Sequence, residues 1–206
     1  MYKILFIILT SGWISSTALV AENTNNLESI PPSEVTFSEF LKVKEMPKVK
    51  IAMSGRNLHR LSHDDLVSEL KKVSGSSPEI FARDEYYHVP AEHSARALIK
   101  WFENVMWKYD TRYRHEAWDC DDYALALATF CEIAAGHDND LSHGFAWGTI
   151  IVNQVDEWAR VAAGGAHELV LVHTENGFLV VEPQNGFHIP LSNYPNREHI
   201  RSVFLN

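Results

Sequence analysis

Residues 118–124, Trp-Asp-Cys-Asp-Asp-Tyr-Ala, place a cysteine and three acidic side chains at the predicted start of a helix. A thiol at a helix N-terminus faces unpaired backbone N–H groups and the positive end of the helix dipole, and both favour the thiolate. The same N–H groups can hold a developing oxyanion. The pattern therefore predicts that Cys120 is a nucleophile. Trp118 would line the cleft beside it or donate its indole N–H to the oxyanion.

A nucleophilic thiol needs a base, and the base needs a group that orients it. His167 begins one β-prone run, and Glu182 ends the next one, just before Pro183. Glu182 follows Val180 and Val181, and an idle carboxylate would be costly to bury in such an apolar strand. We therefore predict His167 as the base and Glu182 as the residue that orients it.

The register of this hairpin stays open at the level of sequence. Asn-Gly at 176–177 is a turn signal. A strict two-residue turn there would leave Glu182 on the same face as His167 but roughly 13 Å along the strand. A longer loop centred nearer Glu175 would make the two nearly cross-strand neighbours. With the strict turn, His173 would lie diagonal to Glu182, which makes His173 the second candidate base.

The acidic side chains that flank Cys120 disfavour a thiolate by like-charge repulsion. A hard cation held by Asp121 and Asp122 would remove the conflict, and calcium fits ligands that are all oxygen. The alternative is that these carboxylates only cap the helix and point to solvent. The thiol chemistry itself requires no cofactor.

The elements that would position these residues form an α+β domain, in which a central buried helix packs on an antiparallel β-sheet. The apolar spacing predicts helices over residues 63–73, with Ser62 as the N-cap, over 90–109 and over 119–136. β-Prone runs separated by turn signals predict strands at 145–152, 167–173, 178–181, 188–191 and 200–205, and a weaker edge strand at 48–53.

The N-terminus predicts export. Residues 1–21 combine one cation, an apolar run and small residues, as in a secretory signal cleaved after Ala18 or Ala21. Residues 22–47 would form a flexible arm, and 48–206 one domain, with a helical part at 60–136 and a β part at 144–206. The mature chain would be periplasmic or extracellular, with no integral membrane segment. The net charge of −9 argues against nucleic-acid binding.

Exported proteins commonly pair their cysteines in disulfides, so a disulfide between the two cysteines of this chain has to be considered. Cys120 and Cys131 are separated by predicted helix, which would hold their Cα atoms about 16 Å apart. A disulfide needs roughly 4.4–6.8 Å. Both thiols are therefore expected to be free.

Three segments resemble the transglutaminase-like cysteine peptidases of the papain superfamily. They are Trp-Asp-Cys-Asp-Asp-Tyr-Ala, Gly-Gly-Ala-His-Glu-Leu-Val and Gly-Phe-Leu-Val-Val-Glu-Pro-Gln-Asn, and the likeness covers roughly residues 86–206. In that family a Cys begins the central helix, a His begins a strand, and an Asp follows about fifteen residues later. Glu182 replaces that Asp here, which is more similar to the papain-like C-terminal domain of a fungal agglutinin, a calcium-dependent protease.

The resemblance implies a secreted or periplasmic thiol hydrolase, a cysteine peptidase or amidase. It would cleave an amide bond of a peptide or cell-wall peptide through a triad of Cys120, His167 and Glu182. Two alternatives stay open. One is acyl transfer of the transglutaminase type, and the other is a non-catalytic binding or immunity module on the same fold.

Overall fold

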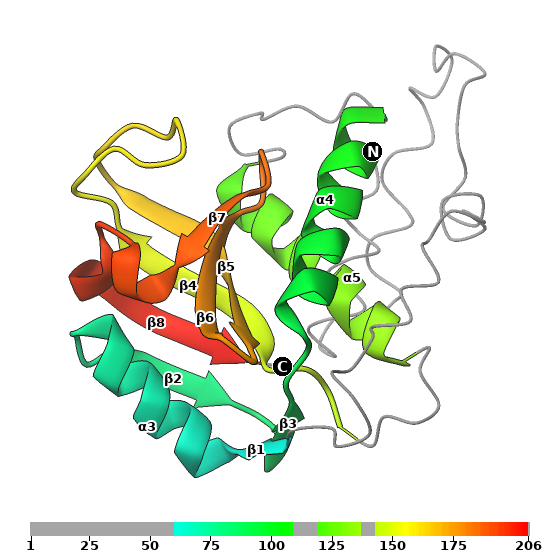
Figure 1. Ribbon diagram of the computed structural model, residues 1–206. Helices are drawn as coiled ribbons and strands as arrows, with labels where there is room; N and C mark the ends of the chain where they lie inside the picture. The colour runs from blue at the N-terminus through cyan, green and yellow to red at the C-terminus, as the bar shows by residue number, and fades with distance from the viewer. Residues whose placement is uncertain (1–59, 109–118, 137–142, 206) are drawn as a thin grey trace, which may run out of the picture. The chain divides into compact units, whose positions relative to one another are not determined.

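The computed structural model describes residues 60–108, 119–136 and 143–205 (Figure 1). The described residues all belong to one compact unit, residues 47–206. The predicted signal at 1–21, the arm at 22–47, the edge strand at 48–53 and Trp118 lie outside the described residues.

Helices α3, α4 and α5 follow the predicted ones closely. Helix α3 spans His63–Ser74, α4 spans Glu92–Lys108, and α5 spans Cys120–Gly136. Ser62 is the N-cap of α3, as predicted, and its side chain accepts a hydrogen bond from the Asp65 backbone N–H at 3.2 Å. Helix α4 begins at Glu92, two residues later than expected.

A sheet of six strands has the order β2-β8-β4-β5-β6-β7, and β1 pairs with β3 in a separate two-stranded sheet. The strands are β1 (Arg60–Ser62), β2 (Glu79–Ala82), β3 (Tyr86–His88), β4 (Trp147–Asn153), β5 (Ala166–Thr174), β6 (Gly177–Glu182), β7 (Phe187–Pro190) and β8 (Ile200–Leu205). The five strands predicted after residue 144 are therefore present, with ends shifted by up to two residues.

The sheet is mixed, which differs from the antiparallel sheet that we predicted. Strand β2 pairs in parallel with β8, with Glu79 opposite Ser202 and Ala82 opposite Leu205. The other pairs in this sheet are antiparallel. β2 is only four residues long, and its partner lies at the far end of the chain. The local sequence therefore predicts neither this strand nor its parallel pairing.

Helices α3 and α5 both pack against the six-stranded sheet. Leu66 and Leu70 of α3 belong to a core cluster with Ile150 of β4 and with Leu169 and Leu171 of β5. Helix α5 contacts β4 and β5 as well, and it lies apart from α3 in Figure 1. Its buried side chains surround much of the helix: Tyr123, Ala124, Ala126, Leu127, Ala128, Phe130 and Cys131. These contacts fix the N-terminus of α5 against the sheet.

Among the described residues, no helix is both long enough and apolar enough to span a membrane.

Candidate functional site: a thiol, a histidine and a carboxylate

Asp119 caps the helix that carries the cysteine. The Asp119 carbonyl oxygen accepts a hydrogen bond from the Tyr123 N–H at 3.1 Å, and the Asp119 N–H donates to Asp122 Oδ2 at 3.2 Å. The first bond is the opening backbone bond of the helix, and in the second the carboxylate of the third helical residue satisfies the N-cap N–H, as the acidic residue of a capping box does. Cys120 is therefore the first residue of α5, and it is half-buried. The predicted position of the thiol at a helix N-terminus is confirmed.

The β5–β6 hairpin has a two-residue loop, but the loop is Glu175–Asn176 and not Asn176–Gly177. Thr174 lies opposite Gly177. The Thr174 hydroxyl fixes this turn, because Oγ1 accepts from the Asn176 N–H at 3.2 Å and donates to the Gly177 carbonyl at 3.0 Å. Gly177, with φ 99°, adopts the left-handed conformation that the turn requires.

This register brings His167 and Glu182 together. Val170 lies opposite Val181, so Glu182 falls next to position 169 and diagonal to His167. His167 Nε2 lies 2.7 Å from Glu182 Oε2, and the Glu182 side chain is fully buried. Glu182 Oε1 accepts a second hydrogen bond from the Gln184 N–H at 3.1 Å. Both carboxylate oxygens are thus engaged, and the carboxylate holds the imidazole ring in one orientation.

The other side of the His167 ring faces the thiol. Burial disfavours the charged imidazole, but hydrogen bonds to the Cys120 side chain and to Glu182, with the negative charge of both partners, outweigh it and raise the pKa of His167 to about 9. At neutral pH the ring is therefore protonated and lies between a thiol group and a carboxylate. The structure brings together the three residues that the sequence singled out.

His173, the second candidate base, lies in a different environment. Its Nε2 is 3.1 Å from Glu69 Oε1 on α3, and its ring meets the Phe178 ring edge-on at a centroid distance of 4.4 Å. His167 is therefore the histidine that the hairpin presents to Cys120.

Both cysteines are free, as predicted. Burial raises the pKa of the Cys131 thiol well above its usual value, so Cys131 is an inert side chain of the core.

Three carboxylates gather at the start of α5. Oxygen atoms of Asp119, Asp121 and Asp122 lie within 4.8 Å of one another. A hydrogen bond that protonated Asp121 donates to the Asp119 carboxylate, burial, and the negative charges of Asp119 and Asp122 raise the pKa of Asp121 to about 6. The group offers only oxygen ligands, as a calcium site does. Asp122 also caps the helix, so the two interpretations of these carboxylates are not mutually exclusive.

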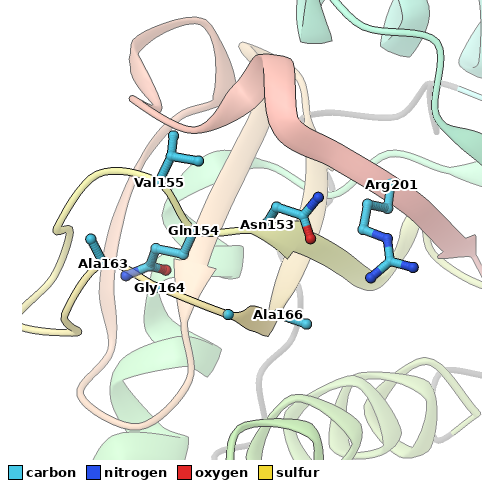
Figure 2. Close-up of a pocket in the computed structure, with 8 residues that line it drawn as sticks. Asn153, Gln154, Val155, Ala163, Gly164, Ala166 and Arg201 are labelled. Atoms are coloured by element: carbon cyan, nitrogen blue, oxygen red, sulfur yellow. The ribbon is translucent and has the colours of Figure 1, made fainter.

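A groove that the sequence did not reveal opens where β4 ends and β5 begins. Figure 2 shows its lining, which includes Asn153 of β4, Gly164 of the returning loop, Ala166 of β5 and Arg201 of β8. The only sequence signals at this place were the Gly164–Gly165 pair and one cation within the apolar run of β8.

No family model and no curated protein sequence matches the chain. Two solved structures share its fold. One, named "PSL1a-E64 complex", has 15% sequence identity and a TM-score of 0.55, and the match covers 71% of this chain and 51% of that chain. The other is a Polyporus squamosus lectin bound to the human-type influenza-binding epitope Neu5Aca2-6Galb1-4GlcNAc, with 15% identity, a TM-score of 0.54 and coverage of 71% and 49%. The match thus spans about half the length of these proteins.

These comparisons contradict the assignment to the transglutaminase-like and papain-like cysteine peptidases. PSL1a is the Polyporus squamosus lectin, so both structures are of a lectin, and neither is described as a peptidase. The predicted thiol hydrolase function, the peptidase or amidase class and the transglutaminase alternative are withdrawn with it. One fold carries many functions, so motifs that specify a fold and a side-chain arrangement do not specify a reaction.

Proposed function

We propose that this chain binds carbohydrate. The supporting observation is the fold that it shares with the Polyporus squamosus lectin, which was solved with a sialylated trisaccharide bound. The match covers 49% of that lectin. The proposal therefore requires that the matched half takes part in sugar binding.

A glycan array probed with the purified protein tests this function, with heat-unfolded protein as the control. Each positive glycan is then titrated by calorimetry, together with Neu5Aca2-6Galb1-4GlcNAc and the same sugar without the sialic acid. Saturable binding of at least one glycan supports the proposal. If the array signal of the folded protein equals that of the unfolded control, and neither sugar gives heat in the titration, the proposal is wrong.

A second proposal concerns Cys120, and the hydrogen-bonded series of Cys120, His167 and Glu182 supports it. In this arrangement a protonated His167 stabilises the Cys120 thiolate, and Glu182 stabilises the imidazolium. Such a thiolate adds readily to an electrophilic carbon. The proposal concerns the reactivity of the thiol and assigns no peptide or amide cleavage to the chain.

Alkylation by iodoacetamide measures this reactivity. The sulfur attacks the methylene carbon, the new S–C bond replaces the C–I bond, iodide leaves, and the proton stays on His167. Peptide mass spectrometry should find fast labelling of Cys120 at neutral pH and none of buried Cys131. His167→Gln should slow the labelling at least tenfold. His199→Gln, at an exposed histidine, is the matched control. Equal rates for His167→Gln and the intact protein would refute the activation.

Two more proposals complete this site. Trp118 would line the cleft beside Cys120, and Asp121 and Asp122, with Asp119, would hold a divalent cation such as calcium.

We also propose a fold of the papain or transglutaminase type. The helix that begins at the cysteine and packs on the sheet of His167 and Glu182 supports it. The fold assignment is independent of the reaction that was withdrawn.

Export also remains a proposal, and the pattern of residues 1–21 supports it. N-terminal sequencing of the protein from outside the cytoplasm should find a chain that begins just after Ala18 or Ala21. An intact Met1 there would indicate anchoring and not cleavage.

A further inference from the structure

The groove at the end of β4 is open to solvent and has a volume of about 520 Å³. Binding sites for small ligands commonly enclose roughly 300–1,000 Å³. Residues from β4, from the 154–165 loop, from the start of β5 and from β8 line it, so segments far apart in the sequence form one site (Figure 2). It is separate from the series of Cys120, His167 and Glu182, none of which lines it.

Arg201 supplies the only charge among the lining residues. The register between β4 and β8 shifts at this place, because Ile151 lies opposite Ser202 while Val152 lies opposite Ile200. Arg201 is therefore the extra residue of a β-bulge. A bulge re-aims the side chain that it carries, and the exposed Arg201 lines the groove. A guanidinium there can hold a carboxylate through two parallel hydrogen bonds.

The wall opposite is held in place by backbone hydrogen bonds. The Gly164 N–H donates to the Gln154 carbonyl at 2.7 Å, and the Gln154 N–H donates to the Gly165 carbonyl at 3.0 Å. Both glycines have positive φ, 113° and 89°, and a Cβ on either would meet no atom within 4 Å. The loop is thus fixed before any ligand binds, and the space above it is open. A site organised in advance loses less entropy on binding.

Gln154 leaves an acceptor without a partner beneath this groove. Its Nε2 donates to the carbonyls of Val161 and Ala162 at 2.8 and 3.2 Å, which fixes the orientation of the amide. Gln154 is 2% exposed, and its Oε1 has no hydrogen-bond partner among the described residues. A buried acceptor in this state is unfavourable, because it has lost its hydrogen bonds to water without gaining others. Because this oxygen is not exposed, a ligand hydroxyl would supply the missing donor through a bridging water.

We infer that this groove binds an acidic sugar, with Arg201 on the carboxylate, the Asn153 amide on a hydroxyl group, and the buried Gln154 Oε1 engaged through a water. The inference rests on the proposed carbohydrate-binding function. A carboxylate alone would match Arg201 but would leave the Asn153 amide and the Gln154 acceptor unused, and a neutral sugar would leave the guanidinium unused. A sugar acid carries both kinds of group close together.

Titration calorimetry with Neu5Aca2-6Galb1-4GlcNAc and with the same sugar lacking the sialic acid tests the inference. The protein should bind the sialylated sugar at least tenfold more tightly. Arg201→Gln should remove that preference. Ala163→Trp, at an exposed alanine on the rim, should block the groove without changing its charge. Arg83→Gln, at an exposed arginine beyond the far end of β2, is the matched control and should bind as the intact protein does.

The outcomes distinguish a wrong assignment of the groove from the absence of carbohydrate binding. If the glycans bind equally well to the intact protein, Arg201→Gln and Ala163→Trp, the groove assignment is wrong and the carbohydrate-binding function stands. If the protein binds only neutral glycans, the acidic specificity is wrong and the function again stands. If no glycan binds the intact protein in the array or the titration, both fall together.

Discussion

His167 Nε2 lies 2.7 Å from Glu182 Oε2, although fifteen residues and a hairpin turn separate the two residues. The contact depends on where the turn begins. A loop at Asn176–Gly177 would have moved Glu182 away along the strand, whereas the observed loop at Glu175–Asn176 makes Glu182 diagonal to His167. The Thr174 hydroxyl bonds on both sides of the turn hold that loop in place. A side chain with no chemical role of its own therefore sets the geometry of the site.

Glu182→Ala should destabilise the fold, because it leaves the His167 ring, which is charged at neutral pH, without its buried counter-charge. Breaking a buried ion pair by removing one partner costs about 3–5 kcal/mol. Urea unfolding monitored by far-UV circular dichroism measures the loss. Glu157→Gln, at an exposed glutamate, should change stability by no more than about 0.5 kcal/mol. A Glu182→Ala protein as stable as this control would show that the pair is not formed in solution.

The stability of the fold should depend on pH through His167. Its folded pKa of about 9 lies above the usual value of 6.5, so the folded state binds the proton more tightly than the unfolded state. The resulting stabilisation is fully present below pH of about 6.5 and is lost as the pH rises through about 9. Urea unfolding of the intact protein and of His167→Gln, between pH 6 and 10, isolates this contribution. The difference in unfolding free energy between the two proteins should shrink as the pH rises. Parallel pH profiles would exclude a contribution from the protonation of His167.

The sequence located most of the elements and the residues of the thiol site, because each gives a strong local signal. Ser62 and Gly75 mark the ends of α3, and the buried helix from Cys120 is apolar nearly all round. His167 and Glu182 stand at strand ends. These features depend on neighbours within a few positions, and that is the range in which periodicity and capping are informative.

Features that depend on distant partners escaped prediction. The parallel pairing of β2 with β8 joins segments about 120 residues apart, and nothing in Glu79–Ala82 indicates that partner. The groove at Arg201 exists because of a bulge, which only the pairing of β8 with β4 reveals. The hairpin register stays open in the sequence because Asn-Gly signals a turn at 176–177, whereas the hydrogen bonds of the Thr174 hydroxyl hold the turn one residue earlier. The reaction, finally, was inferred from a family resemblance, and neither fold nor spacing determines a reaction.

Gly148→Ala should destabilise the sheet strongly, because β4 and β8 approach each other too closely at this position for a side chain. A Cβ there would lie 1.8 Å from the Phe204 carbonyl oxygen and 2.9 Å from the Leu205 Cα. Both are backbone atoms, so relief requires the strands to separate, and we expect a cost of about 3 kcal/mol or more. Thermal unfolding measures it. Ser202→Ala, on the neighbouring strand, should have a small effect, and an equal effect of the two would exclude this close approach.

Calcium should stabilise the protein through the carboxylates at the start of α5. Asp119, Asp121 and Asp122 place oxygen atoms within 4.8 Å of one another, and their mutual repulsion would fall when a divalent cation binds. The effect should depend on pH. The pKa of Asp121 is raised to about 6, so at pH 5 the carboxylate is protonated and a cation must displace the proton, whereas at pH 7.5 the site is ready to bind.

The measurement is the thermal midpoint with calcium and with a chelator, at pH 5 and at pH 7.5. Calcium should raise the midpoint at pH 7.5 and have less effect at pH 5. Asp121→Asn should abolish the rise, and Asp64→Asn, at an exposed first-turn aspartate of α3, should keep it. The rate of Cys120 alkylation, measured in the same four conditions, tests whether the cation also activates the thiol. Equal alkylation rates with calcium and with chelator would limit the cation to a structural role. A thermal midpoint that calcium does not change at pH 7.5 would mean that these carboxylates only cap the helix.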